Sequence, residues 1–255
     1  QEIWEAKLEP VYPYRKAGPT VEPVTGSLTA PAAPKIGVAK PKVIIPVFPG
    51  TNCEYDTAKA FARAGADPEI LVIRNLTPAD VTASCEALVK AIGESQIVML
   101  PGGFSGGDEP DGSAKFIASF FRSPAVTEAV RRLLQQRDGL MLGICNGFQA
   151  LIKLGLVPYG DIRPITAYDP TLTFNTIGRH QSMLVRTRIA STGSPWLSKC
   201  AVGDEHTVAI SHGEGRFVAP QEVLDTLIKN GQVATQYVDL TGTPTMDQRC
   251  NPNGS

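Results

Sequence analysis

The chain has 255 residues, of which 42% are hydrophobic, and its 24 lysines and arginines against 25 aspartates and glutamates give a net charge of -1. This length can bury the core of one large α/β domain or of two small ones. The balanced charge argues against a nucleic-acid surface, and the sequence contains no run of about 20 apolar residues that would cross a membrane.

The N-terminal part is rich in proline. Residues 1–41 hold seven of the 21 prolines and show little periodicity. Such a composition favours an extended, semi-rigid linker over a packed element. We therefore expect the first folded domain to begin at residue 42.

Apolar strands and amphipathic helices alternate from residue 42 to residue 155. Short apolar runs predict strands at 42–48, 69–73, 96–100 and 138–142, and helices are predicted at 54–65, from 77 on, at 113–121, 125–136 and 148–154. Thr77, Pro78 and Asp80 form a helix-start pattern of cap, first-turn proline and third-position acid. The alternation predicts an α/β fold with a doubly wound, mostly parallel sheet. Extended runs at 182–186 and 207–211 predict added antiparallel strands.

The sequence GICNG at residues 143–147 predicts a nucleophile elbow. It lies where a buried strand turns into a helix, and Cys145 stands at the turn with Gly143 and Gly147 two residues away on either side. Such a turn holds a side chain clear of the sheet, and the helix N-terminus favours a thiolate. Cys145 is therefore the predicted nucleophile; a buried, inert cysteine is the alternative.

A second stretch, GFSGG at residues 103–107, also follows a strand and makes Ser105 an alternative nucleophile. The acidic, proline-containing residues 108–112 cannot begin a helix there, so a serine hydrolase is the weaker reading. Gly102 and Gly103 suit an oxyanion hole better, because glycine lets backbone N–H groups approach a substrate carbonyl.

Two other cysteines fit packing roles. Cys53 starts a helix, but it lacks a following glycine and precedes acidic residues that oppose a thiolate. Cys85 falls on the apolar face of its helix. The five cysteines form no Cys-x-x-Cys pair, and their odd number argues against a complete disulfide framework. We therefore expect the protein to be located in the cytoplasm, where cysteines stay reduced.

A cysteine nucleophile needs a base, and the sequence offers His180, His206 and His212. His212 precedes Glu214 in a His-x-Glu pattern just after an apolar strand. Spacing alone makes Cys145, His212 and Glu214 a candidate triad, and a substrate-contacting or structural loop is the alternative.

Five ordered motifs resemble the glutaminase part of formylglycinamide ribonucleotide amidotransferase, also called phosphoribosylformylglycinamidine synthase. They are FPGTNC at 48–53, LPGGFS at 100–105, GICNGFQ at 143–149, SHGEGR at 211–216 and NPNGS at 251–255. The resemblance covers residues 42–255 and implies a class I glutamine amidotransferase with a flavodoxin-like sheet. It also implies a C-terminal part of the single-chain form, in which residues 1–41 are the tail of a preceding synthetase domain.

The resemblance implies that Cys145 attacks the side-chain amide of glutamine and forms a glutamyl thioester, which water hydrolyses to glutamate. The ammonia released would serve the ATP-dependent conversion of formylglycinamide ribonucleotide to the amidine. The implied oxyanion donors are the amides of Gly102, Gly103 and Asn146. The implied glutamine-binding residues are Gln149, Ser211, His212, Gly213 and Glu214.

The same resemblance changes the expected base. In this family the His-x-Glu pair follows the NPNGS stretch, so the catalytic His and Glu are expected after Ser255. Residues 42–255 would then be a C-terminally truncated domain, and we expect its hydrolytic activity to be weak. The expected partners are glutamine and the synthetase domain. ATP and Mg²⁺ are expected to bind to that synthetase domain, and no cofactor or metal is expected in residues 42–255. A glutamine-binding docking or regulatory module without turnover is the non-enzymatic alternative.

Overall fold

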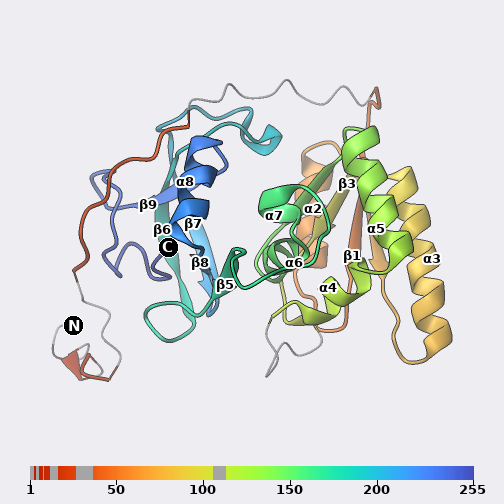
Figure 1. The fold of residues 1–255 in the computed structure, drawn as a ribbon, viewed down its shortest axis with the longest axis horizontal. Coiled ribbons are helices and arrows are strands. Elements are labelled where there is room, and N and C mark those ends of the chain that lie inside the picture. Colours follow the sequence, from red (N-terminus) through yellow and green to blue (C-terminus); the bar gives the residue numbers. More distant parts are fainter. Residues whose placement is uncertain (1–2, 4–5, 8, 12–16, 27–36, 106–112) are drawn as a thin grey trace. The chain divides into compact units, whose positions relative to one another are not determined.

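The computed structural model describes residues 3, 6–7, 9–11, 17–26, 37–105 and 113–255. The chain divides into two compact units (Figure 1). The parallel-sheet unit is Pro34–Ala167, and the antiparallel-sheet unit combines Gln1–Ala33 with Tyr168–Ser255. Within the described residues, no helix is both long and apolar enough to span a bilayer.

The parallel-sheet unit contains four strands in the order β2-β1-β3-β4, all parallel, as the alternating pattern predicts. Its elements in chain order are β1 Lys42–Val47, α2 Glu54–Arg63, β2 Asp67–Val72, α3 Pro78–Glu94, β3 Ile97–Leu100, α4 Lys115–Phe121, α5 Pro124–Arg131, the π-helical turn η2 Arg132–Gln136, β4 Leu140–Gly143, α6 Asn146–Leu154 and α7 Leu156–Tyr159.

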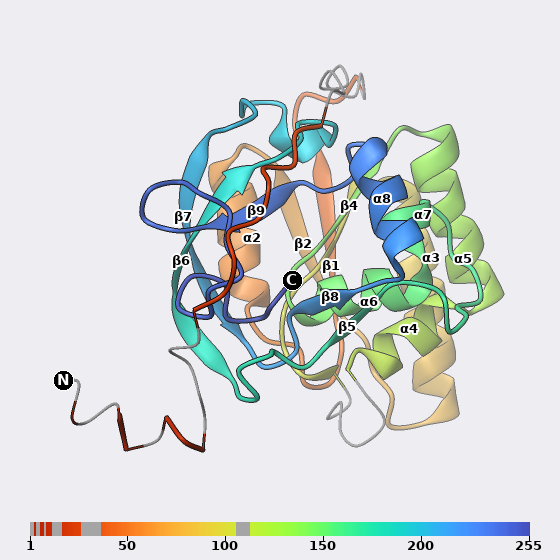
Figure 2. The ribbon, with the colours of Figure 1, turned by 60° about the vertical axis from the view of Figure 1, so that its left-hand side comes forward.

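Both faces of this sheet are covered. Ile44 of β1 belongs to a core cluster with side chains of α3, α4, α5 and α6, whereas Val43 and Ile45 pack on the other face against α2. Figure 2 shows α2 on one side of the strands and α3, α5 and α6 on the other. Strands buried on both faces must be apolar throughout, which is why these runs lack polar alternation.

Helix α3 begins as its sequence predicts. Thr77 is the N-cap: its Oγ1 accepts a hydrogen bond from the Asp80 amide at 3.1 Å, and Asp80 Oδ2 accepts one from the Thr77 amide at 3.2 Å. The buried face is centred on Ser84 and Leu88, with Cys85 only partly buried. Cys85 packs against the same core cluster as Leu88, which confirms its predicted packing role. Ser84 is also buried, and its hydroxyl bonds to the backbone of Arg74 after β2.

The antiparallel-sheet unit contains a three-stranded sheet in the order β7-β6-β9 and a two-stranded β5-β8 pair. Its elements are β5 Thr171–Thr173, β6 Gln181–Ile189, the 3-10 turn η3 Pro195–Leu197, β7 Glu205–His212, β8 Arg216–Val218, α8 Gln221–Lys229 and β9 Thr235–Val238. The predicted runs at 182–186 and 207–211 pair with each other in antiparallel orientation within this three-stranded sheet, as expected.

Part of the proline-rich N-terminal segment packs on the antiparallel-sheet unit. The Val21 amide donates to Pro244 O at 3.0 Å, and the buried Gly26 donates to Ala190 O at 2.8 Å. These hydrogen bonds and the isolated bridge between Thr20 and Thr245 tie the segment to the rest of the unit. Much of residues 1–41 lies outside the described residues.

Candidate active site

Cys145 occupies a sharp strand-to-helix turn. Strand β4 ends at Gly143, α6 begins at Asn146, and Cys145 between them has φ 53° and ψ -112° with an exposed side chain. Positive φ is uncommon for a residue with a Cβ and costs on the order of 1–3 kcal/mol. Because the Cys145 side chain is exposed, the buried-cysteine alternative is wrong. The thiol stands at the N-terminus of α6, where the helix dipole favours negative charge.

The glycines beside Cys145 are required for space. A Cβ on Gly147 would lie 2.0 Å from Leu100 O, and one on Gly143 would lie 2.6 Å from the Gly147 carbonyl. Neither glycine has positive φ; the strained residue is Cys145 itself. The elbow motif thus reflects close packing of the first turn of α6 on the ends of β3 and β4.

The loop after β3 lies beside the thiol. A Cβ on Gly102 would be 3.3 Å from Cys145 Cβ and 4.0 Å from its Sγ. Gly102 O accepts a hydrogen bond from the Asn52 amide at 2.8 Å, which turns this carbonyl toward residues 50–52. Because the C=O and N–H of a trans peptide point in opposite directions, the Gly103 N–H is aimed away from residues 50–52.

Gly103 itself fits only as glycine. Its φ is +140°, and a Cβ there would lie 2.5 Å from Gly50 O. The Phe104 amide donates to the same Gly50 O at 2.8 Å, so the loop is held on both sides of Gly103. Rigid backbone next to an exposed thiol is the arrangement that an oxyanion hole needs, and the donor roles of Gly102, Gly103 and Asn146 stay predictions.

The side chains of Asn146 and Gln149 form a buried polar pair on the first turn of α6. Asn146 is 1% exposed and Gln149 8% exposed. Asn146 Oδ1 accepts from the Ser105 amide at 3.2 Å, and its Nδ2 donates to Gln149 Oε1 at 3.0 Å. The sequence motifs assigned Gln149 to glutamine binding and Asn146 only a backbone role, so they missed this link.

Ser105 does not fit a nucleophile. It is 1% exposed, and its Oγ has no hydrogen-bond partner among the described residues. A nucleophile must reach substrate, so the serine-hydrolase alternative fails on burial. The acidic residues 108–112 lie outside the described residues.

Cys53 is exposed, which corrects its expected packing role. It is the N-cap of α2 with φ 68°, and Glu54 and Asp56 stand in the first turn, where their charges oppose a thiolate.

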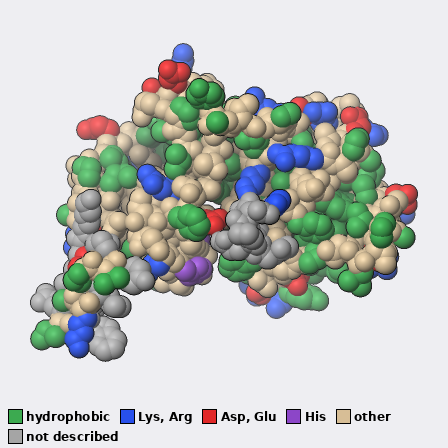
Figure 3. All heavy atoms as spheres, turned by 60° about the horizontal axis from the view of Figure 1, so that its bottom comes forward, with side chains coloured by type: hydrophobic (Ala, Val, Ile, Leu, Met, Phe, Trp, Pro, Cys, Tyr) green, Lys and Arg blue, Asp and Glu red, His purple; other side chains and the backbone are tan. Residues whose placement is uncertain are grey.

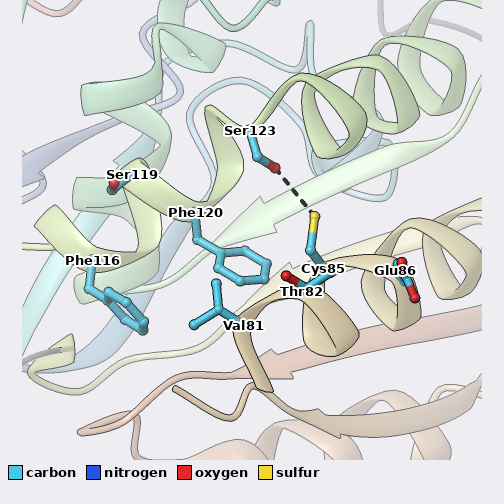
Figure 4. Close-up of a pocket in the computed structure, with 8 residues that line it drawn as sticks. All are labelled: Val81, Thr82, Cys85, Glu86, Phe116, Ser119, Phe120 and Ser123. Atoms are coloured by element: carbon cyan, nitrogen blue, oxygen red, sulfur yellow. Dashed lines mark hydrogen bonds between the residues drawn. The ribbon is translucent and has the colours of Figure 1, made fainter. Parts of the chain in front are cut away.

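Cys85 lines a shallow hollow between α3 and α4. Figure 4 shows its sulfur directed toward Ser123, whose Oγ lies 3.6 Å away, with Val81, Phe116 and Phe120 forming the apolar wall. None of the predicted site residues lines it.

On the face shown in Figure 3, green hydrophobic side chains gather on the parallel-sheet unit.

In the antiparallel-sheet unit, Asn175 organises the SHGEGR loop. Its side chain is 3% exposed; Nδ2 donates to His212 O at 2.8 Å, and Oδ1 accepts from the Gly215 amide at 3.2 Å. The Asn175 amide also donates to Gly213 O at 2.8 Å. No motif pointed to Asn175, because an isolated asparagine before a turn carries no sequence signal of its own.

The ring of His212 is fixed by the same asparagine. His212 Nδ1 lies 3.0 Å from Asn175 Oδ1, which can only accept, so Nδ1 carries the proton and Nε2 is the acceptor of the neutral ring. Burial lowers the pKa of His212, and the charge of His180 lowers it further. The partner that orients His212 is thus Asn175, where the sequence suggested Glu214.

Further contacts join this loop to the NPNGS stretch. Asn253 Nδ2 donates to Gly215 O at 2.9 Å and lies 3.0 Å from the Tyr237 hydroxyl, while His180 Nε2 lies 2.9 Å from Ser211 Oγ. Two of the five sequence motifs therefore assemble in this unit, and the other three assemble around Cys145 in the parallel-sheet unit. Among the described residues, no group of three His, Cys, Asp or Glu side chains could hold a metal ion.

An exposed cysteine at a strained turn, at the carboxyl edge of a parallel sheet and next to a glycine loop, is the arrangement of α/β enzymes that use a thiol nucleophile. A family model described as the CobB/CobQ-like glutamine amidotransferase domain matches residues 40–255. The phosphoribosylformylglycinamidine synthase subunit PurQ of Rubrobacter xylanophilus is 34% identical over 214 residues, covering 84% of this chain and 78% of the relative. The corresponding subunit of Symbiobacterium thermophilum is 35% identical over 212 residues, covering 82% and 75%.

One solved structure, "Structure of PurLQS from Thermotoga maritima", matches with a TM-score of 0.57 at 22% identity, covering 83% of this chain and 84% of that one, and supports the fold. The chain belongs to the PurQ family of CobB/CobQ-like glutamine amidotransferases.

Proposed function

We propose that the chain hydrolyses glutamine to glutamate and ammonia through a thioester on Cys145. The single observation that carries this proposal is the exposed Cys145 thiol at a strained turn beside Gly102, in a member of a glutamine amidotransferase family.

The proposed reaction takes place in four steps. The Cys145 thiolate attacks the side-chain carbonyl carbon of glutamine, and the negative oxygen that forms would be held by the amides of Gly102, Gly103 and Asn146. The carbon–nitrogen bond then breaks, and the nitrogen leaves as ammonia after taking up the proton that the Cys145 thiol gave to the base. Water attacks the thioester in turn, which releases glutamate and restores the thiol.

The ammonia is proposed to serve an ATP-dependent synthetase that converts formylglycinamide ribonucleotide to the amidine, because the relatives are named as subunits of phosphoribosylformylglycinamidine synthase. ATP and Mg²⁺ are proposed to bind to that synthetase. The solved Thermotoga maritima structure is named for PurLQS, and this name supports such an assembly. A synthetase in the same polypeptide and a cytoplasmic location stay predictions; the mass of the native protein on an immunoblot tests the first.

The base is a separate question. The resemblance favours a His-x-Glu pair after Ser255, with His212 contacting glutamine. Replacing His212 by Gln then raises KM for glutamine and leaves kcat within about 10-fold, whereas loss of a general base costs about 10²–10⁴-fold in kcat.

The experiment that tests the nucleophile compares the glutaminase rate of the full chain with that of Cys145→Ala and, as a matched control, Cys53→Ala. We expect Cys145→Ala to lose at least about 10³-fold and Cys53→Ala to keep the rate. A glutamine-mimicking diazoketone should add its mass to Cys145 only. Equal rates for wild type and Cys145→Ala would refute the enzyme and favour a glutamine-binding module without turnover.

A further inference from the structure

We propose that residues 17–26, the strap, are an in-chain ligand of the antiparallel-sheet unit, and that their binding holds the C-terminal stretch 244–255 in its folded position. The strap lies before residue 40, where the match to the glutamine amidotransferase model begins. Figure 1 shows it in orange-red beside β9. The binding surface is separate from the proposed reaction, because neither Cys145 nor glutamine takes part in it.

The first half of the strap pairs with residues 244–246 in antiparallel orientation. The Val21 amide donates to Pro244 O at 3.0 Å, and the Met246 amide donates to Pro19 O at 2.9 Å. These two hydrogen bonds flank an antiparallel bridge. Both prolines take part through their carbonyls, so their missing N–H groups remove no hydrogen bond from this pairing. The proline-rich composition is therefore compatible with a bound, strand-like segment.

The two ends of the strap approach their partners closely. A Cβ on Gly18 would lie 2.3 Å from the carbonyl carbon and oxygen of Met246 and 2.6 Å from the Asp247 nitrogen. These are backbone atoms, which no side-chain rotation can move away, so the strap binds here only with glycine. At the other end, Gly26 is buried, and a Cβ there would lie 2.8 Å from Ser191 Cβ.

The second half of the strap is bound by a cross-strand pair of side chains. Arg188 of β6 and Gln236 of β9 are paired in the register of these strands. Gln236 Oε1 accepts a hydrogen bond from the Val24 amide at 2.7 Å, and Arg188 Nη1 donates to Val24 O at 3.0 Å. Because both side chains bind backbone groups of the same residue, the surface recognises an extended main chain.

The strap is connected to the NPNGS stretch through Thr245, which is 4% exposed. Thr245 O accepts a hydrogen bond from Asn251 Nδ2 at 3.1 Å, and Asn251 Oδ1 accepts one from the Gly254 amide at 2.9 Å. The neighbouring Asn253 donates through Nδ2 to Gly215 O at 2.9 Å. A continuous set of contacts therefore leads from the strap to the SHGEGR loop.

The C-terminal stretch depends on such contacts because it has no regular structure of its own. Residues 239–255, all of which the structure describes, form neither a helix nor a strand beyond isolated bridges. A segment of this kind opens locally unless hydrogen bonds and packing from elsewhere hold it. Since the strap supplies the antiparallel partner of residues 244–246, we expect the stretch to loosen when the strap is released.

Amide hydrogen exchange of the full chain tests this. Among the described residues, the hydrogen bonds of the Gln236 side chain go to the strap, to the Val24 amide and Glu22 O, so Gln236→Ala acts on the strap. We expect the Met246 and Asn251 amides to exchange at least about 10-fold faster, because losing a partly buried hydrogen bond makes local opening easier. The control is Glu22→Ala, which shortens an exposed strap side chain, keeps the backbone groups and should leave exchange unchanged.

A second variant, Gly18→Ala, keeps the inference testable where Gln236→Ala fails to fold. Its Cβ would displace the strap from Met246, and the same amides should exchange at least about 10-fold faster. Its matched control is Gly93→Ala, where a Cβ meets no atom within 4 Å.

Wild-type exchange of the Met246 and Asn251 amides in both variants would overturn the inference. Faster exchange confined to residues 17–26 would do the same, because the strap would then bind without holding the C-terminal stretch. A loss of protection spread equally over β6, β7 and β9 would show a general loss of stability and would also count against it. None of these results bears on the proposed function, which is decided separately by the activity of Cys145→Ala.

Discussion

Replacing Gly147 by alanine should separate α6 from the end of β3. A Cβ at residue 147 would lie 2.0 Å from Leu100 O, and ordinary contact begins at 3.4 Å, so the first turn of α6 must move by about 1.4 Å. Both partners are backbone in a fully buried region, since Leu100 is 0% exposed, and no side chain can turn aside. Overpacking of this kind costs about 1–3 kcal/mol, and we expect the upper end.

The same displacement should lower the glutaminase rate by about 10²-fold, because Cys145 is two residues away and moves with the turn. Urea unfolding followed by circular dichroism measures the first effect, and a steady-state assay measures the second. The matched control is Gly93→Ala in α3, where a Cβ meets no atom within 4 Å. That variant should gain about 0.5–1 kcal/mol, because alanine favours a helix. A Gly147→Ala protein with the wild-type urea midpoint would refute the packing explanation of the elbow.

Three further outcomes follow from the structure. Thr77→Ala should cost about 1 kcal/mol of unfolding free energy through loss of the α3 cap, whereas Thr82→Ala in the same helix should change little; equal losses in urea titrations would contradict the capping account. Burial and the neighbouring His180 lower the pKa of His212, so its ring binds a proton less readily in the folded state than in the unfolded state. The neutral His212 ring therefore contributes fully to stability above about pH 6.5, and this contribution is lost as the pH falls below that value. The urea midpoint of wild type should then fall between pH 7.5 and pH 5.5 by more than that of His212→Gln, and parallel pH profiles would count against this. Asn175→Ala should cost about 2–3 kcal/mol because it leaves buried backbone groups without partners, against less than about 0.5 kcal/mol for exposed Asn230→Ala, and a thermal melt in which the two variants coincide would rule this out.

Local signals in the sequence were sufficient for the elements of the parallel-sheet unit. The four apolar runs became four parallel strands, and the Thr77 pattern became the cap of α3. Cys145 could be singled out because an elbow is made by consecutive residues. These features depend on contacts within a few positions or on burial of whole strands, which composition alone records.

Other features depend on residues that are distant in the chain. The Ser105–Asn146 hydrogen bond spans 41 positions, and the contact of Asn175 with His212 spans 37. An asparagine that bonds across such a distance looks like any other asparagine in a linear sequence. The exposure of Cys53 and the burial of Ser105 were likewise decided by packing and not by their neighbours in sequence.

The sequence by itself determined the parallel α/β fold, the reactive cysteine and the resemblance to a glutamine amidotransferase, because each is written in short motifs and hydrophobic periodicity. Only the tertiary structure decided why Gly147 must be glycine, which atom of Gln149 faces Asn146, and which nitrogen of His212 carries the proton. Those depend on distances between segments far apart in the chain, which only the folded backbone fixes.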